Sequence, residues 1–292
     1  MLYNGDIYVI KSYRICGIGV SIEAEHFPEG NSDWLAFEAP EAENALRISC
    51  VISDSLERNI SRTIGKSKNA TVYCDGGLIM REMPMGTAEG AMTVYSPTGN
   101  GVVSYFTHES FDTMMDFRFM WSSVALPQLF LYRKVIFLHS SYIDVGGKAI
   151  LFSAPCQTGK STQAALWQKH RGAEIINGDK SGISVSDGKV IAHGVPFCGT
   201  SGICKNRSVP LGAIVILSQA ENNSVRRLGG VDSLQAIMNN TYLDFIAPDE
   251  QRTFVDCVIE ILGHVPVYHL ACTPDEDAVT ALETALKKEG VI

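Results

Sequence analysis

The stretch APCQTGKST, residues 154–162, contains the residue types that bind phosphate groups in proteins. It matches the pattern A/G-x-x-x-x-G-K-S/T, with alanine in the first place. The backbone N–H groups of such a loop surround phosphate oxygens, its lysine reaches the β- and γ-phosphates, and its serine hydroxyl ligates Mg²⁺. The sequence therefore predicts a phosphate-binding loop. The residues predicted to contact a nucleotide are Ala154, Pro155, Cys156, Gln157, Thr158, Gly159, Lys160, Ser161 and Thr162.

The segments on both sides of the loop fit this prediction. The apolar run KAILFS before it is typical of a β-strand, and the run STQAALWQKH after it is rich in helix formers. A helix that begins at Lys160 directs its positive N-terminal end at a bound anion, and Gly159 lets the backbone approach the phosphate closely. The alternative is a glycine-containing turn without any ligand. We favour phosphate binding because strand, loop and helix follow in the required order.

A carboxylate that could serve the metal follows the helix. The predicted strand AEIING leads to Asp179, and a carboxylate at the carboxyl end of a strand beside the loop strand lies in the site crevice. There Asp179 could hold Mg²⁺ or take a proton from an attacking hydroxyl. Aspartate is also common in turns, and NGDKSG is turn-rich, so a structural role stays open. Lys180 next to it is interpreted as a solvated charge.

Four further residues have two interpretations each. His193, in IAHGVPF, is either a site residue or a polar side chain that closes a hairpin. Arg207, Arg226 and Arg227 could complement a transferred phosphate, since a planar guanidinium suits that charge. Arg207 is the preferred one of the three because it stands just before a predicted strand. Surface arginines without such a role are the alternative.

Residues 1–130 are predicted to form a smaller, β-rich α+β domain. Short strands with turn punctuation are expected in YRICGIGVSIEAE, NALRISCVIS and ATVYCDGGLIMRE, with a hairpin in GAMTVYSPTGNGVVSYF. The segment ESFDTMMDFRFMWSSVALPQLFLYRK has apolar residues at helical spacing, and Pro127 is expected to interrupt it or to start a second helix. Its apolar part is predicted to be buried between the two halves, with a contact between two copies of the chain as the alternative.

Residues 131–292 alternate strands with helices, which predicts an α/β domain. The expected strands are KVIFLHSSYIDV, KAILFSA, AEIING, ISVSDGKVIAHG and GAIVILSQA. The expected helices are GKSTQAALWQKHRG, GVDSLQAIMNNTYLDFI, PDEQRTFVDCVIEILGH and PDEDAVTALETALKKEG. Proline and acidic residues suit a first helical turn, where N–H groups are unpaired and the helix dipole favours negative charge.

The bulk composition limits the classes of function. The chain has a formal charge of −8, with 46% hydrophobic and 19% charged residues. This balance disfavours a general nucleic-acid role through phosphate neutralisation. No window is long and apolar enough to span a bilayer, and the N-terminus does not resemble a secretion signal. The eight cysteines include no CxxC pair, so reduced thiols and a cytoplasmic location are expected.

Residues 133–245 together resemble the HPr kinase/phosphorylase family and its shorter serine-kinase relatives. The resemblance is carried by His139 ahead of the loop strand, by the loop, by RGAEIINGDK, and by HGVPFCGTSG followed by VPLGAIVILSQAENNSVRRL. It implies a phosphoenolpyruvate carboxykinase-like P-loop domain with a mixed sheet. It also implies ATP-dependent phosphorylation of a hydroxyl group, classically that of a serine.

The resemblance further implies roles for single residues. Lys160 and Ser161 would lie at the phosphates and the metal, and Asp179 would be a metal ligand or the general base. His139 would lie close to the transferred phosphate; the alternative is a polar residue on a half-buried strand whose side chain bonds to a neighbour. The chain departs from the family at two places. It has Gly178-Asp179 where relatives usually have paired acids, and PFCGTSG contains no acid. The resemblance therefore does not extend to HPr as the acceptor or to the reverse phosphorylase reaction.

Three functions are compatible with these residues. The preferred one is an ATP- and Mg²⁺-dependent phosphotransferase whose acceptor is an unidentified hydroxyl on a protein or a small molecule. The first alternative is a carboxykinase-like lyase that acts on oxaloacetate. The second is a nucleotide-sensing binding module without turnover. This alternative is retained because only one acid follows the loop helix, where relatives usually have two. The N-terminal half carries no chemical motif, so acceptor recognition or a homo-oligomer contact is expected of it by analogy only.

Overall fold

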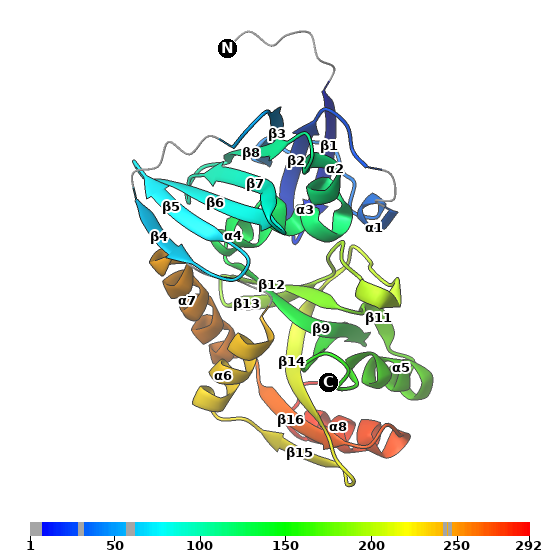
Figure 1. The fold of residues 1–292 in the computed structure, drawn as a ribbon. Helices are drawn as coiled ribbons and strands as arrows, with labels where there is room; N and C mark the ends of the chain where they lie inside the picture. Colours follow the sequence, from blue (N-terminus) through cyan, green and yellow to red (C-terminus); the bar gives the residue numbers. More distant parts are fainter. Residues whose placement is uncertain (1–7, 29–31, 57–61, 242–243, 245–246) are drawn as a thin grey trace. The chain divides into compact units, whose positions relative to one another are not determined.

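The computed structural model of the chain describes residues 8–28, 32–56, 62–241, 244 and 247–292 (Figure 1). Two compact units divide the chain. One contains Met1–Arg133 together with Asp244–Thr253, and the other contains Lys134–Leu243 together with Phe254–Ile292. Each unit has its own eight-stranded mixed sheet in the described residues, so the fold is mixed α/β.

The sheet of the first unit joins hairpins with parallel pairs. Its strands are β1 (Val9–Ile15), β2 (Ile18–Ala24), β3 (Leu46–Ser53), β4 (Thr63–Lys66), β5 (Thr71–Asp75), β6 (Leu78–Met85), β7 (Ala88–Tyr95) and β8 (Gly101–Thr107). They lie in the order β1-β2-β3-β8-β7-β6-β5-β4. The β2–β3 and β3–β8 pairs are parallel and the other pairs are antiparallel.

Two segments of the first unit that the sequence predicts as strands are hairpins in the structure. YRICGIGVSIEAE turns at Cys16-Gly17, both with positive φ, and its halves form the antiparallel pair β1–β2. ATVYCDGGLIMRE turns at Gly76-Gly77 and forms β5–β6. Two-residue hairpin turns of type I′ need two residues with positive φ, which glycine adopts without strain and which Cys16 adopts here. The predicted hairpin in GAMTVYSPTGNGVVSYF is confirmed as β7–β8.

The helical segment of the first unit is broken into short pieces. The helices of this unit are α1 (Ser32–Leu35), α2 (Phe111–Met115), α3 (Phe117–Ser123) and α4 (Leu126–Leu131). Asp116 ends α2 and caps α3, because its side chain accepts a hydrogen bond from the Arg118 N–H. Pro127 stands in the first turn of α4, so the prediction that it starts a helix is confirmed.

The segment Asp244–Thr253 is held in the first unit by buried polar contacts. The hydroxyl of Tyr95 donates to Glu250 Oε1 at 2.9 Å, and Glu250 is fully buried. The guanidinium of Arg81 donates to the Asp244 carbonyl at 3.0 Å. A buried carboxylate is costly unless hydrogen bonds satisfy it, so Tyr95 and Glu250 depend on each other.

The second unit contains both strands and helices, in runs rather than in strict alternation. Its strands are β9 (Val135–Val145), β10 (Lys148–Ser153), β11 (Glu174–Asn177), β12 (Lys180–Ser186), β13 (Lys189–His193), β14 (Ser208–Gln219), β15 (Ser224–Arg227) and β16 (Val267–Cys272). Its helices are α5 (Lys160–Arg171), α6 (Gly230–Asn240), α7 (Pro248–His264, whose first residues belong to the first unit), α8 (Glu276–Lys288) and the short 3-10 helix η1 (Gly199–Ser201).

Five strands of the second unit form a closed ring of pairings. The order β10-β9-β12-β13-β14 is completed by a parallel β10–β14 pair, and β16 and β15 extend the sheet beyond β14. β10, β14 and β16 run in the same direction, so their carboxyl ends lie at one edge. The sequence does not predict β15 or β16. The helix predicted for residues 230–246 ends at Asn240, and residues 242–243 and 245–246 lie outside the described residues.

One face of this sheet packs against α5 and α8, which lie side by side (Figure 1). The buried cluster between them includes Phe152 of β10, Trp167 of α5, Val215 of β14 and Leu282 of α8. The rings of Phe152 and Trp167 are 6.4 Å apart between centroids. This packing fixes the first turn of α5 against the end of β10, which is the position of the predicted phosphate loop.

Within the part of the chain that the structure describes, no helix is both long and apolar enough to cross a bilayer.

Candidate functional site

The structure places APCQTGKST between β10 and α5. Ala154 is buried at the end of β10, and α5 begins at Lys160. The loop between them turns with positive φ at two residues, 63° at Gln157 and 116° at Gly159. A φ of 116° is strained for any residue with a side chain, so glycine is required at position 159 for the conformation.

The loop and the first turn of α5 expose a row of backbone donors. Among the described residues, the N–H groups of residues 156–162 donate to no other group, and the first such bond in α5 comes from Gln163 to the Gly159 carbonyl. Unpaired N–H groups that continue into a helix N-terminus form an anion-binding site, because the helix dipole adds positive potential there. This local geometry fits a phosphate group.

Lys160 is anchored at the base of this loop. The residue is 7% exposed, and its Nζ donates to the carbonyls of Ala154 at 2.8 Å and Pro155 at 3.1 Å. An ammonium group has three N–H donors, so one remains for a ligand. Burial lowers the pKa of Lys160, while Cys156 and Asp179 oppose that shift electrostatically. The charge of Asp179 therefore acts on the lysine of the loop.

The hydroxyls of Ser161 and Thr162 lie at the exposed start of α5. Neither hydroxyl donates or accepts a hydrogen bond within the described residues. Both are therefore available to a ligand or to a metal ion that a phosphate brings with it. The other predicted contact residues of the loop, from Pro155 to Thr158, are exposed or half-buried.

Strand pairing brings His139 and Asp179 to the end of β10. Ser153, the last residue of β10, pairs with Ser140 of β9, and its hydroxyl donates to the His139 carbonyl at 2.9 Å. Asp179 lies between β11 and β12, both of which pair with β9, and its carbonyl accepts from the Ser140 N–H at 3.0 Å. Three segments that are distant in sequence therefore meet at one point.

Both oxygens of the Asp179 carboxylate have partners. His139 Nε2 lies 3.3 Å from Oδ1, and Lys180 Nζ lies 2.7 Å from Oδ2. Burial alone would raise the pKa of Asp179, but the hydrogen bonds and charges of His139 and Lys180 outweigh it and hold the pKa well below the usual range. Asp179 is therefore ionised at neutral pH. The interpretation of Lys180 as a solvated charge is wrong, because its side chain is only 15% exposed and bonds to Asp179.

Asn177 shapes the turn that carries Asp179, and the sequence analysis did not identify it. Its side-chain Oδ1 accepts from the backbone N–H groups of Asp179 and Lys180, each at 2.9 Å. Its Nδ2 donates to the Val195 carbonyl at 2.8 Å, and the residue is fully buried. The signal for this role is the NGD sequence, since asparagine often accepts hydrogen bonds from the backbone that follows it.

The short helix η1 packs directly on the Asp179 turn. A Cβ atom at Gly199 would lie 2.9 Å from Cβ and Cγ of Asp179, and one at Gly178 would lie 2.0 Å from Ser201 Oγ. No such contact is tolerated without movement of the chain. The glycines of PFCGTSG and NGD therefore allow η1 to position Asp179.

We expect Gly199→Ala to lower activity at least about tenfold. The added methyl group would displace the Asp179 carboxylate, and a shift of a fraction of an ångström misaligns a group that must be held precisely. Gly202→Ala is the matched control: Gly202 also has positive φ, but a Cβ there meets no atom within 4 Å. Comparing kcat and the thermal midpoint of both variants tests this expectation. Equal losses in both variants would show that backbone strain alone explains the effect.

His193 has a structural role. The residue is 6% exposed, and its Nε2 and Nδ1 each lie 2.7 Å from a serine hydroxyl, those of Ser184 and Ser208 respectively. Burial lowers its pKa to about 4. The interpretation of His193 as a residue that closes a hairpin is the one that these contacts support, because they join β12, β13 and the start of β14.

The His193 contacts predict a pH effect on stability. A histidine in the unfolded chain binds a proton below its ordinary pKa near 6.5, whereas the folded protein keeps His193 unprotonated down to about pH 4. The free energy of unfolding should therefore decrease as the pH falls from 6.5 toward 4. Between pH 6.5 and pH 5 this loss is about 2 kcal/mol. His193→Gln should not show it. Urea unfolding of both proteins at pH 7 and pH 5 measures the difference, and parallel pH profiles would contradict the assignment.

The arginines do not face the loop. Arg207 forms ion pairs with Asp144 and Glu174 at the far end of β9. Asp144 lies five residues along this strand from His139, which corresponds to about 17 Å. Arg226 and Arg227 lie exposed on β15, where they approach Asp232 and Glu289. The preference for Arg207 as a phosphate ligand is not supported by its position.

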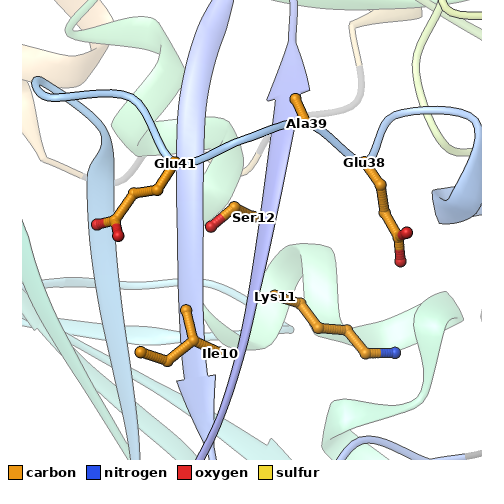
Figure 2. Close-up of a pocket in the computed structure, with 6 residues that line it drawn as sticks. All are labelled: Ile10, Lys11, Ser12, Glu38, Ala39 and Glu41. Carbon is orange, nitrogen blue, oxygen red and sulfur yellow. The ribbon is translucent and has the colours of Figure 1, made fainter.

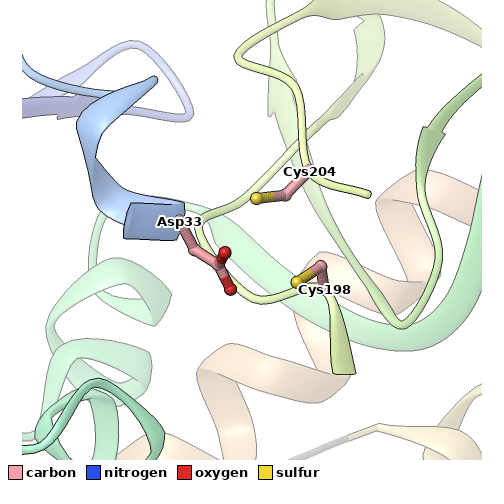
Figure 3. A group of neighbouring side chains, drawn as sticks. All are labelled: Asp33, Cys198 and Cys204. Atoms are coloured by element: carbon pink, nitrogen blue, oxygen red, sulfur yellow. The ribbon is translucent and has the colours of Figure 1, made fainter. Parts of the chain in front are cut away.

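No disulfide links the eight cysteines, all of which lie in the described residues. Cys198 and Cys204 of the β13–β14 segment have Sγ atoms within 4.8 Å of each other (Figure 3). Cys156 is exposed in the loop between β10 and α5.

A depression of about 530 Å³ lies in the first unit and is separate from the residues above. It is open and is lined by Ile10, Lys11, Ser12, Glu38, Ala39 and Glu41 (Figure 2). Its side chains carry opposite charges and no group that the sequence analysis singled out. It offers no chemistry of its own.

The residues at the loop fit a magnesium ion that is held mainly by a nucleotide. In the described residues, no three histidine, cysteine or carboxylate ligand atoms gather around Asp179. Mg²⁺ in such sites is usually bound by one or two carboxylates, a hydroxyl and substrate phosphates. Ionised Asp179 and exposed Ser161 provide that donor set.

The second unit thus combines a mixed sheet with a strand–loop–helix segment, β10 to α5, and an ionised aspartate. No protein-family model matches the sequence, and no curated protein matches it. Among solved structures, the HPr(Ser) kinase/phosphatase from Coxiella burnetii is similar at 13% identity and a TM-score of 0.33. The match covers 53% of this chain and 99% of that one. The likeness is distant.

Proposed function

We propose that this protein is an ATP-dependent phosphotransferase that phosphorylates a hydroxyl group. The observation that carries the proposal is the continuous row of unpaired N–H groups at residues 156–162, beside an anchored lysine and an ionised carboxylate. The first N–H groups of any helix are unpaired, but here the row also includes the preceding loop. The row suits the β- and γ-phosphates of a nucleotide, and the resemblance of residues 133–245 to the HPr kinase/phosphorylase family supports the same assignment.

Each residue has a defined task in this proposal. The loop N–H groups bind and orient the phosphates, and the remaining N–H of Lys160 neutralises charge that develops on the transferred group. Ser161 and Asp179 would hold Mg²⁺, which when bound would supply positive charge to offset that of the phosphates. Asp179 is held ionised by His139 and Lys180, so it can orient the acceptor hydroxyl as well as ligate the metal. His139 donates to Asp179 and limits the directions in which the carboxylate points.

One observation favours a second function, a nucleotide-sensing module. The carboxylate that acts on Lys160, that of Asp179, is already paired with Lys180 and His139. A carboxylate engaged in this way binds metal less readily. Such a protein would bind ATP tightly without forming a product.

The direct test incubates the purified full chain with γ-labelled ATP and Mg²⁺. Acceptors to be added are free serine, other hydroxyl metabolites, seryl peptides and cell lysate. A labelled phosphomonoester identified in any mixture supports the proposal. Saturable ATP binding without labelled product would favour the sensing module, and nucleotide-dependent release of CO₂ from oxaloacetate would favour a carboxykinase-like lyase.

A further inference from the structure

Lys180 stands in an unusual position for a site that is to receive a divalent cation. Its Nζ lies 2.7 Å from Oδ2 of Asp179, and the two side chains are 15% and 25% exposed. The other carboxylate oxygen lies 3.3 Å from His139 Nε2. A positively charged group therefore occupies one of the two oxygens that a metal ion would use.

The backbone fixes this ion pair in place. The N–H groups of Asp179 and Lys180 both donate to Oδ1 of the buried Asn177. Lys180 pairs across the sheet with His139, so β9 also sets its position. Its Nζ lies 5.8 Å from the ring centroid of Phe197, a distance at which an ammonium group is attracted to the ring. The pair is thus part of the fold and differs from exposed surface pairs, which contribute little.

A divalent cation and the ammonium of Lys180 repel each other when both contact Asp179. The repulsion is strong in a partly buried site, because the effective dielectric constant is below that of water. Nucleotide phosphates change the balance, since they bring negative charge that can pair with both cations. A divalent cation should therefore bind weakly to the free protein and more tightly once a nucleotide is bound.

We propose that Lys180 is a positioning residue that competes with the divalent metal for Asp179 and so makes metal binding depend on bound nucleotide. In the free protein Lys180 holds the carboxylate in place and disfavours an isolated ion. When nucleotide and metal bind together, the ammonium of Lys180 moves from Oδ2 to the phosphates. The inference rests on the proposed function, because it takes Asp179 as a metal ligand.

The test measures Mn²⁺ binding to the full chain without nucleotide, by calorimetry or electron paramagnetic resonance. Lys180→Met and Lys180→Gln should each bind Mn²⁺ at least about tenfold more tightly than the wild type. Lys180→Arg keeps the charge and should bind like the wild type. Lys205→Met is the matched control, since Lys205 forms a similar pair with Glu174 at 2.8 Å, away from the loop.

If Lys180 only stabilised the fold, replacing it would not raise the affinity for Mn²⁺. The Mn²⁺ affinity therefore separates a structural role of Lys180 from competition with the metal. Equal Mn²⁺ affinities of the wild type, Lys180→Met and Lys180→Gln would overturn the inference, whether or not the variants are less stable. ATP binding is measured in parallel on every protein. If ATP binds normally while the affinities are equal, the inference fails and the proposed function stands. If no protein binds ATP, the proposed function fails as well.

Discussion

Lys160→Ala is expected to reduce phosphate transfer by about 10³-fold and to leave both units folded. The ammonium is anchored to the carbonyls of Ala154 and Pro155, so it is already in place for the developing charge of the transferred group. Alanine removes that charge but keeps the backbone N–H groups of the loop. Release of labelled phosphate, together with circular dichroism of the variant, measures the two effects.

Lys169→Ala is the matched control for this variant. Lys169 lies in the last turn of the same helix and is exposed, so its loss removes an equal charge far from the loop. Activity close to that of the wild type is expected. Wild-type turnover by Lys160→Ala would leave no catalytic role for the loop, and unfolding of that variant would show that the anchored ammonium is needed for stability.

Asp179→Asn is expected to lower turnover by about 10²- to 10⁴-fold while nucleotide binding persists. The amide keeps the size of the side chain and loses the charge that holds a metal or attracts a hydroxyl proton. Since the pKa of Asp179 is held well below its usual range, the wild type should not lose activity through protonation of this carboxylate between pH 8 and pH 5. Single-turnover kinetics over that pH range, with a fluorescent nucleotide to follow binding, measures both properties.

Asp187→Asn provides the comparison for Asp179→Asn. Asp187 lies exposed in the turn between β12 and β13, where asparagine tolerates the positive φ. It should keep full activity. If Asp179→Asn turned over at the wild-type rate, the carboxylate would be no part of the reaction, and the nucleotide-sensing module would become the better account.

The sequence predicts the local elements of the site well, because each has a short-range signal. The order of strand, loop and helix around Gly159 and Lys160 follows from residue types alone, and α5 ends at Gly172 as expected. The proximity of His139 to Asp179 is different, because it depends on the register of β9 against β12. Only the resemblance to a family pointed to it.

Contacts that depend on packing had no signal in the sequence. A lysine beside an aspartate usually points into solvent, and only the turn made by Asn177 brings Lys180 back to Asp179. The close approach of η1 to Asp179 requires two glycines from separate segments to meet, Gly178 and Gly199. The sequence does not predict β16 because VYHLAC is short and shows no clear alternation, although prolines flank it, and its parallel pairing with β14 is long-range.

The path of the chain restricts how the protein can be dissected. The chain passes from one unit to the other after Arg133, after Leu243 and after Thr253. No single cut therefore releases either unit complete. A fragment that starts at Lys134 would retain Glu250 but lose Tyr95, and would leave that carboxylate without the hydroxyl that satisfies it. Limited proteolysis or truncation should for this reason yield poorly folded pieces, even where the nick falls in an exposed linker.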